Sequence, residues 1–258
     1  MNSFLRVIIS EKKKEAEGIK LPDESLMPAY KAESLAGAVK NQADNAVITE
    51  IKFRSPSEGR IAEECDPKSI AAEYISGGCT AISVLTDERH FGGRKEFLEE
   101  VTVVARKSGI PLLRKDFIVD ERQMYETKMI GADAVLLIAG ILGRRTEEFC
   151  ELAASLSIEP LVEVRTEEEA DLALSCGAEI IGINNRNLNT MNTDLKNTRE
   201  ISEYIRREND SAVIISESGY NSPDDIAAMK KYCDGFLIGT SLMKADNRRE
   251  AVEGFVCV

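Results

Sequence analysis

Histidine is nearly absent from this sequence: His90 is the only one in 258 residues. This scarcity argues against a zinc site, because histidine is a principal zinc ligand. A Ser–His–Asp triad would also have to use His90, which lies in a polar stretch beside Asp87 and Arg89. We therefore expect acid–base chemistry to fall to lysine, glutamate or aspartate.

Other absences narrow the class of protein. None of the six cysteines forms a C-x-x-C pair, so we expect reduced thiols in a cytoplasmic protein. No apolar run approaches membrane-spanning length, and Met1–Lys14 lacks the apolar core of a signal peptide. The net charge of −12 argues against nucleic acid or an anionic membrane as a partner. A small anionic substrate remains compatible with that charge, since a few local cations suffice to bind one.

What the chain does contain is a series of short runs rich in Val, Ile and Leu. Such runs are typical of parallel strands that are buried on both faces. The predicted strands are Ala46–Phe53, Ala81–Leu85, Pro111–Asp116, Ala134–Ile138, Pro160–Val164, Ile180–Asn184, Ala212–Ser216 and Phe236–Ile238.

Longer amphipathic segments separate these runs. A small pair such as Gly131-Ala132 often follows them, as expected where a helix ends. Repeated strand–helix units favour a closed barrel or a doubly wound sheet. The lack of G-x-G-x-x-G after the first strand, and of a P-loop, counts against the nucleotide-binding sheet. The predicted helices are Asp66–Ser76, Lys95–Ser108, Glu121–Ile130, Arg145–Leu156, Thr166–Cys176, Asn197–Glu208 and Pro223–Tyr232.

We therefore predict an α/β fold, a (β/α)8 TIM barrel over residues 46–258, in a chain that forms one domain from 1 to 258. Residues 1–45 precede the first strand and have helical patterns at Asn2–Glu17 and Ser34–Asn41. We expect them to form an N-terminal helical extension that packs on the barrel.

Charged residues occupy the first predicted strand, where a barrel should have its core. Side chains alternate along a strand, so Ile48, Glu50 and Lys52 share one face and the apolar residues between them share the other. The apolar face should meet the helices, which turns Glu50 and Lys52 inward. Because a buried unpaired charge is unfavourable, the two residues form either part of a site or a structural ion pair.

The same alternation turns polar side chains of other strands inward. Lys115, Glu163 and Asn184 lie on the inward faces at the ends of the third, fifth and sixth strands. In the seventh strand we assign Ser216 and Ser218 to the inward face, opposite Glu217. Active sites of barrel enzymes lie at the carboxyl ends of the strands, so this convergence predicts a site.

Small residues after the last two strands predict a phosphate site. Ser216–Gly219 follows the seventh strand, and Gly239-Thr240-Ser241 follows the eighth. Backbone N–H groups there can approach an anion, and a short helix would add its dipole. The alternative is a pair of tight turns without a ligand. The loop Arg54–Gly59 after the first strand is either a lid or a solvated loop.

Several segments in order resemble the indole-3-glycerol phosphate synthase family, from about Ile48 to Met243. They are Glu50–Ser57, Ala81–Asp87, Leu113–Phe117, Gly131–Ile138, Leu161–Val164, Ile181–Leu188, Ser216–Gly219 and Leu237–Met243. The resemblance implies a barrel enzyme of tryptophan biosynthesis. Such an enzyme converts 1-(2-carboxyphenylamino)-1-deoxyribulose 5-phosphate into indole-3-glycerol phosphate, carbon dioxide and water, with no cofactor or metal.

The resemblance also implies residue roles. Lys115 matches the general acid of ring closure, and Lys52 and Glu163 match residues of the dehydration steps. Glu50 tunes the lysines, while Asn184 and Ser218 orient substrate groups. The matching binding residues are Arg186 near the anthranilate carboxylate, Ser55, Gly219, Gly239 and Thr240 around the phosphate, and Phe91, Phe117 and Leu136 around the aromatic ring.

Two rival classes remain. Phosphoribosylanthranilate isomerase, a related barrel, would use a cysteine–aspartate pair, and the first strand has no cysteine. A non-catalytic barrel that binds phosphorylated metabolites would lack one of the charged mouth residues, and none is missing. For the enzyme we also expect depressed pKa values at Lys52 and Lys115, since two cations lie close together and partly desolvated. We expect a monomer or a weak homo-oligomer.

Overall fold

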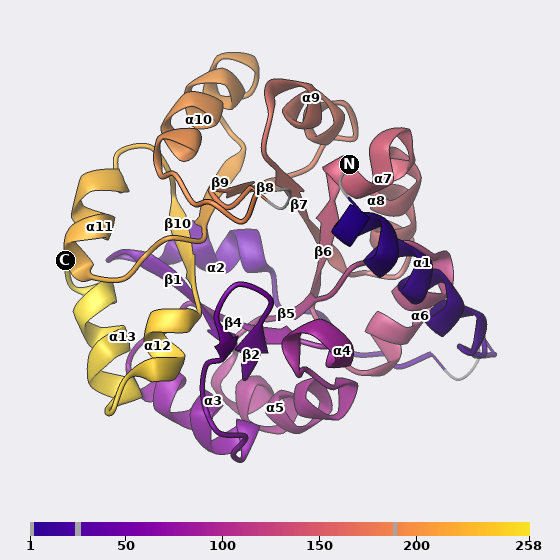
Figure 1. Cartoon of the computed structure of the whole chain (residues 1–258), viewed down its shortest axis with the longest axis horizontal. Helices are drawn as coiled ribbons and strands as arrows, with labels where there is room; N and C mark the ends of the chain where they lie inside the picture. The colour runs from indigo at the N-terminus through magenta and orange to yellow at the C-terminus, as the bar shows by residue number, and fades with distance from the viewer. Residues whose placement is uncertain (1–2, 24–26, 188–189) are drawn as a thin grey trace.

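The structure, a computed structural model, describes residues 3–23, 27–187 and 190–258. Its parallel strands close into a barrel surrounded by helices (Figure 1). Each barrel strand pairs with the next along the chain, and the last closes on the first with Gly235 opposite Ala46. The predicted (β/α)8 TIM barrel is therefore confirmed. Its strands are β1 (Ala46–Ile51), β4 (Ala81–Leu85), β5 (Leu112–Lys115), β6 (Ala134–Ile138), β7 (Glu159–Val164), β8 (Ile180–Asn184), β9 (Val213–Glu217) and β10 (Gly235–Ile238).

A small hairpin follows the first barrel strand. The predicted strand Ala46–Phe53 ends at Ile51, and the chain then leaves the barrel. Strands β2 (Arg54–Ser55) and β3 (Gly59–Arg60) pair antiparallel over the segment for which we predicted a loop. Gly59 has a φ of +66°, which suits the turn between these strands.

The helices form the outer layer, and the local sequence fixes where they begin. In α3, Pro67 is the first residue, and the Asp66 side chain accepts a hydrogen bond from the Lys68 N–H. A capping box of Asp120 and Gln123 starts α6. The helices are α1 (Ser3–Glu17), α2 (Leu35–Asn41), α3 (Pro67–Ser76), α4 (Glu88–Phe91), α5 (Lys95–Ser108), α6 (Glu121–Met129), α7 (Ala139–Leu142), α8 (Thr146–Ser155), α9 (Glu167–Ser175), α10 (Lys196–Glu208), α11 (Pro223–Met229), α12 (Thr240–Lys244) and α13 (Arg248–Val256), with a 3₁₀ turn at Gly143–Arg145.

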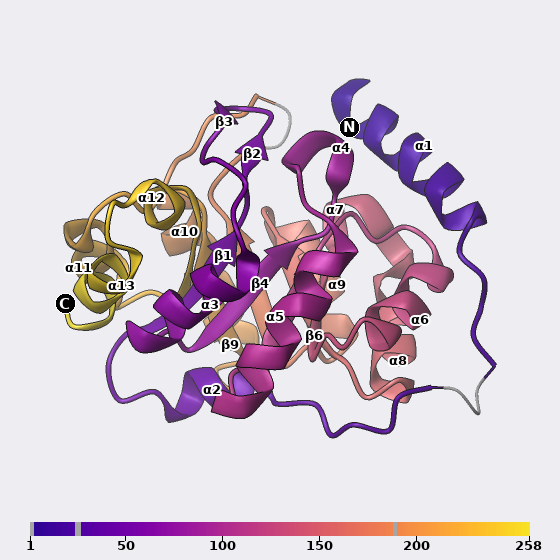
Figure 2. The same cartoon turned by 90° about the horizontal axis from the view of Figure 1, so that it is seen from below.

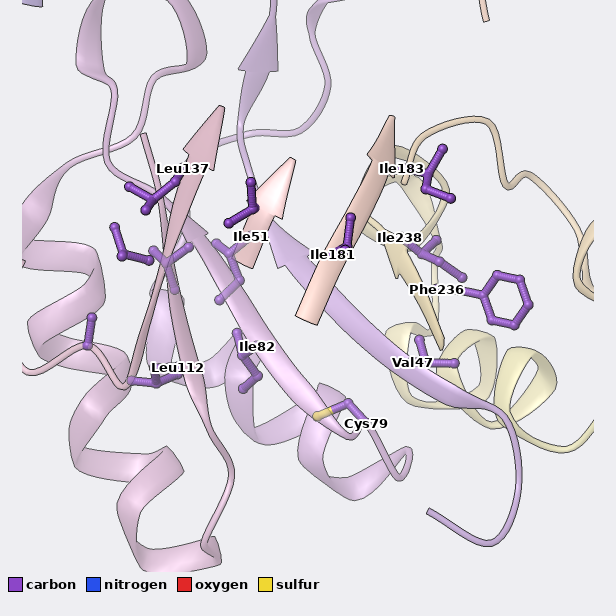
Figure 3. Close-up of a cluster of buried hydrophobic side chains, with 14 of the residues drawn as sticks. Val47, Ile51, Cys79, Ile82, Leu112, Leu137, Ile181, Ile183, Phe236 and Ile238 are labelled. Carbon is purple, nitrogen blue, oxygen red and sulfur yellow. The ribbon is translucent and has the colours of Figure 1, made fainter. Parts of the chain in front are cut away.

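Apolar side chains on the two faces of the barrel strands form two clusters. The inward-facing cluster fills the barrel and includes Ile48, Leu113 and Leu161. The outward-facing cluster packs against the helices, and burying it stabilises the fold by about 25 cal/mol for each Å² removed from water. Figure 3 shows part of this outer cluster, including Val47, Ile51, Ile82, Leu112, Leu137, Ile181, Ile183, Phe236 and Ile238.

The N-terminal residues contribute a helix to each end of the barrel (Figure 2). At the amino ends of the strands, the Leu35 and Ala36 N–H groups of α2 donate to the carboxylate of Glu159. Helix α1 lies at the opposite end, beside α4 (Figure 2). The predicted start of this helix at Asn2 lies outside the described residues. Among those that are described, no helix is long and apolar enough to cross a membrane.

A buried ion pair network fixes α1 to the barrel mouth. The Lys12 side chain is almost fully buried, and its Nζ lies 2.9 Å from Asp87 Oδ2 and 3.0 Å from Asp116 Oδ1. Thr86 and Arg114 also donate to Asp116. Burial raises the pKa of Asp116, but Arg114 and Lys12 outweigh that effect and lower the pKa to about 2.

Replacing Lys12 with Met should destabilise the protein, because it leaves two buried carboxylates without their shared cation. We expect the free energy of unfolding in urea to fall by about 3 kcal/mol at pH 7. The control is Lys13→Met, which changes an exposed lysine on the same helix. Equal stability of the two variants would contradict the anchoring role of Lys12.

Candidate active site

A cavity of about 380 Å³ opens at the carboxyl ends of the barrel strands. Leu5 of α1 and Ser55–Glu58 of the hairpin contribute to its wall. All the residues to which the family resemblance gave a role line this one cavity. They are Glu50, Lys52, Ser55, Phe91, Lys115, Phe117, Leu136, Glu163, Asn184, Arg186, Ser218, Gly219, Gly239 and Thr240.

The charged side chains in the cavity form an alternating chain. The Lys52 Nζ lies 2.6 Å from Glu50 Oε1, and the Lys115 Nζ lies 3.7 Å from Glu50 Oε2. The same Lys115 Nζ lies 2.5 Å from Glu217 Oε2. The ion pair between Glu50 and Lys52 therefore exists, but it continues into a larger network that faces the cavity.

Glu217 is the important residue that the sequence prediction assigned wrongly. We predicted that Ser216 faces inward and Glu217 outward. In the structure Ile215 belongs to the inner cluster and Ile214 to the outer one, so Glu217 points into the barrel. Ser216 instead faces the helix layer, where its hydroxyl contacts Thr198. Ser218 still reaches the cavity because it follows the strand and has a φ of +70°.

Two glycines provide space for the buried carboxylates. A Cβ at Gly182 would collide with the Glu217 carboxylate, and a Cβ at Gly239 would collide with that of Glu50. We predicted Gly239 only as part of a phosphate site. Its close approach to Glu50 is a second reason why a side chain does not fit there.

The ionisation of Lys115 differs from our expectation. Burial lowers the pKa of this ammonium, but the carboxylates of Glu217, Glu50 and Glu163 outweigh burial and raise the pKa above its ordinary value. The prediction of a depressed pKa at Lys115 is therefore wrong. It considered the neighbouring cation but not the inward-facing Glu217.

The carboxyls of the cavity ionise differently from one another. Burial raises the pKa of Glu50, but Lys52 and then Lys115 outweigh burial, so the net shift is downward. Burial and the nearby charge of Glu217 raise the pKa of Glu163 to about 7, despite Lys115 and a hydrogen bond from Asn184 Nδ2. Glu163 is thus able to take up and release a proton near neutral pH.

An apolar wall and a polar rim complete the cavity. The rings of Phe91 and Phe117 lie with centroids 6.0 Å apart, next to Leu136 in the cavity wall. The cavity lining also includes serine, threonine and glycine from the hairpin and from the ends of β9 and β10. The Arg186 side chain adds a cation to the cavity. The backbone N–H of Arg186 donates to Asn184 Oδ1 at 2.9 Å. The small polar and glycine residues are Ser55, Ser57, Ser218, Gly219, Gly239 and Thr240.

This arrangement defines a TIM-barrel enzyme whose cavity brings lysines and glutamates together beside an apolar wall. Among the described residues no group of three or more His, Cys, Asp or Glu is placed to hold a metal ion. The model of one family, "Indole-3-glycerol phosphate synthase", matches residues 5–255. The chain belongs to the indole-3-glycerol phosphate synthase family.

Individual relatives agree with this assignment. An indole-3-glycerol phosphate synthase of Shouchella clausii is 41% identical over 252 residues, which cover 96% of each chain. One of Acetivibrio thermocellus is 42% identical over 224 residues, covering 86% of this chain and 84% of the relative. A solved thiamine phosphate pyrophosphorylase from Pyrococcus furiosus is only 18% identical but has a TM-score of 0.63 over 86% of this chain and 96% of its own. That likeness concerns the fold alone.

The raised pKa of Glu163 predicts a pH-dependent effect on stability. A carboxyl with a folded pKa of about 7, against 4.5 ordinarily, destabilises the folded protein as the pH rises from 4.5 through 7. Glutamine cannot ionise, so Glu163→Gln should be more stable than the parent by about 2–3 kcal/mol at pH 8. That gain should nearly vanish at pH 4.5.

Urea unfolding at the two pH values measures this difference. Glu208→Gln, at an exposed position of α10, is the matched control and should show no such pH dependence. A gain in Glu163→Gln that is the same at pH 8 and pH 4.5 would argue against a raised pKa.

Proposed function

We propose that the chain is an indole-3-glycerol phosphate synthase of tryptophan biosynthesis. It would close the indole ring of 1-(2-carboxyphenylamino)-1-deoxyribulose 5-phosphate and release carbon dioxide and water. The observation that carries the proposal is the Lys52–Glu50–Lys115–Glu217 network, whose first three members line a cavity with an aromatic wall. Membership of the family supports the same conclusion.

Lys115 is the proposed acid of ring closure. The aryl carbon attacks the ketone carbon, and the ketone oxygen takes a proton as the new carbon–carbon bond forms. The raised pKa of Lys115 keeps the side chain as an ammonium, able to donate to that oxygen and to stabilise charge on it. Loss of carbon dioxide then supplies the electron pair that restores the aromatic ring.

Dehydration needs an acid and a base in the same cavity. The hydroxyl leaves as water after taking a proton, and a base removes a proton from the adjacent atom to form the indole double bond. We assign the base to Glu163, whose pKa of about 7 suits proton transfer near neutral pH. Lys52 is the proposed acid, and Glu50 holds it at 2.6 Å.

The remaining cavity residues would bind the substrate. We propose that Ser55, Gly219, Gly239 and Thr240 surround the phosphate, where small residues leave backbone N–H groups accessible. Phe91, Phe117 and Leu136 would contact the aromatic ring. Arg186 would bind the anthranilate carboxylate, and Asn184 and Ser218 would orient substrate groups.

The net charge of −12 supports a partner that is a small metabolite and not a nucleic acid. We further propose that the chain acts in the cytoplasm without cofactor or metal, as one domain in a monomer or weak homo-oligomer.

Replacing Lys115 with Met should abolish turnover, because the ketone oxygen then lacks its proton donor. Turnover is measured by the indole fluorescence that appears after addition of 1-(2-carboxyphenylamino)-1-deoxyribulose 5-phosphate. Calorimetry should show that the folded variant still binds this substrate. Near-parental turnover would exclude Lys115 as the acid, and a folded parent protein that gives no signal would exclude the proposed function.

Replacing Glu217 with Gln tests the positioning of Lys115. The change removes the carboxylate at 2.5 Å and should lower kcat about 10- to 100-fold with little change in KM, since Glu217 does not itself line the cavity. A neutral partner should also lower the pKa of Lys115 and move the alkaline limb of the pH–rate profile downward. Glu200→Gln, on the exposed face of α10, is the control. An unchanged kcat and pH profile would contradict the positioning role.

A further inference from the structure

Two thiols of the outer helix layer touch each other. The Sγ of Cys150 on α8 lies 3.1 Å from the Sγ of Cys176, the residue that follows α9. Even carbon atoms, which are smaller than sulfur, normally approach only to about 3.5–4.0 Å when they are not bonded. The two sulfur atoms are therefore closer than ordinary packing places them, and little movement separates them from a covalent bond.

The two thiols differ in access to solvent. Cys150 on α8 is buried, whereas Cys176 is only partly buried. Among the other cysteines Cys79 and Cys233 are buried, and Cys65 and Cys257 are exposed. Cys176 is therefore the more accessible of the two thiols, and the Sγ of Cys150 lies 3.1 Å from it.

We propose that Cys150 and Cys176 form a dithiol modification site that a small-molecule disulfide oxidises to an intramolecular disulfide. The Cys176 thiolate attacks one sulfur of the small disulfide, whose S–S bond breaks and releases one thiol. Cys150, losing its proton, then attacks Cys176 and displaces the second thiol. The protein loses two protons and two electrons, which the small disulfide gains as it becomes two thiols.

The surroundings of the two thiols indicate that Cys176 reacts first. The hydrogen bond between the two thiols lowers the pKa of Cys176, which outweighs the effect of burial. That same hydrogen bond, and then burial, raise the pKa of Cys150. Cys176 is therefore both the more accessible thiol and the one that more readily forms the attacking thiolate.

The bond would close a loop from Cys150 to Cys176 that contains β7 and therefore Glu163. It would link α8 to α9, the helices on either side of that strand in the chain. Closing a loop of this length restricts the unfolded chain, so the oxidised protein should unfold at a temperature roughly 5–10 °C higher than the reduced protein.

The test treats the folded, reduced full-length protein with oxidised glutathione and maps its peptides under non-reducing conditions. We expect one Cys150–Cys176 cross-linked peptide, an intact mass lower by two hydrogens, and the predicted rise in melting temperature, all reversed by dithiothreitol. Cys176→Ser should lose the cross-link, while Cys79→Ser, which changes a buried thiol elsewhere, should retain it.

The peptide map of the protein without substitutions decides the outcome, even if a variant folds poorly. Glutathione attached to Cys176 without a bond to Cys150 would overturn the proposal. So would two unmodified thiols at these positions under conditions that fully modify the exposed Cys65.

Discussion

The ammonium of Lys115, held between Glu217 and Glu50 inside the barrel, is the interaction on which the site depends. Buried carboxylates are strongly unfavourable unless cations neutralise them. The backbone adapts to this requirement, because glycines at 182 and 239 leave space for the two carboxylates. Lys115 lies on the inward face of β5, so its side chain reaches the space between these carboxylates.

A second ion network fixes the same strand end from the other side. Arg114 and Asp116 flank Lys115, and the Arg114 side chain donates to Asp116 Oδ2 at 3.1 Å. The Asp116 carboxylate forms an ion pair with Lys12 of α1. It also accepts hydrogen bonds from Thr86, at the end of β4, and from Arg114 of β5. The N-terminal helix thus does more than cover the mouth. It supplies a cation to the network directly behind the proposed acid, so the position of Lys115 is constrained on both faces of the strand.

The sequence predicted the barrel and the set of cavity residues because both follow from local patterns. Side chains alternate along each strand, and active sites of barrel enzymes lie at the carboxyl ends of the strands. Strand β9 shows where that reasoning stops. Both of its faces begin apolar and end polar, so periodicity alone does not say whether Ser216 or Glu217 faces inward. Tertiary contacts decide, since Thr198 on α10 binds the Ser216 hydroxyl. Lys12 was missed for the same reason: its buried carboxylate partners, Asp87 and Asp116, lie more than seventy residues away in the chain. Helices α4, α7 and α12 are too short to show a period.

The error about Lys115 sharpens the proposed mechanism. A lysine with a raised pKa is a weak acid, so full proton transfer to a neutral ketone has little driving force. Its ammonium instead stabilises negative charge on the ketone oxygen most strongly as that charge develops, when the oxygen becomes basic enough to take the proton. Glu163 differs, because its pKa of about 7 lets it exchange a proton in either direction. In this cavity Lys115 therefore stays a cation, whereas Glu163 exchanges its proton. Glu217 contributes to both properties, because its charge raises the pKa of Lys115 and that of Glu163.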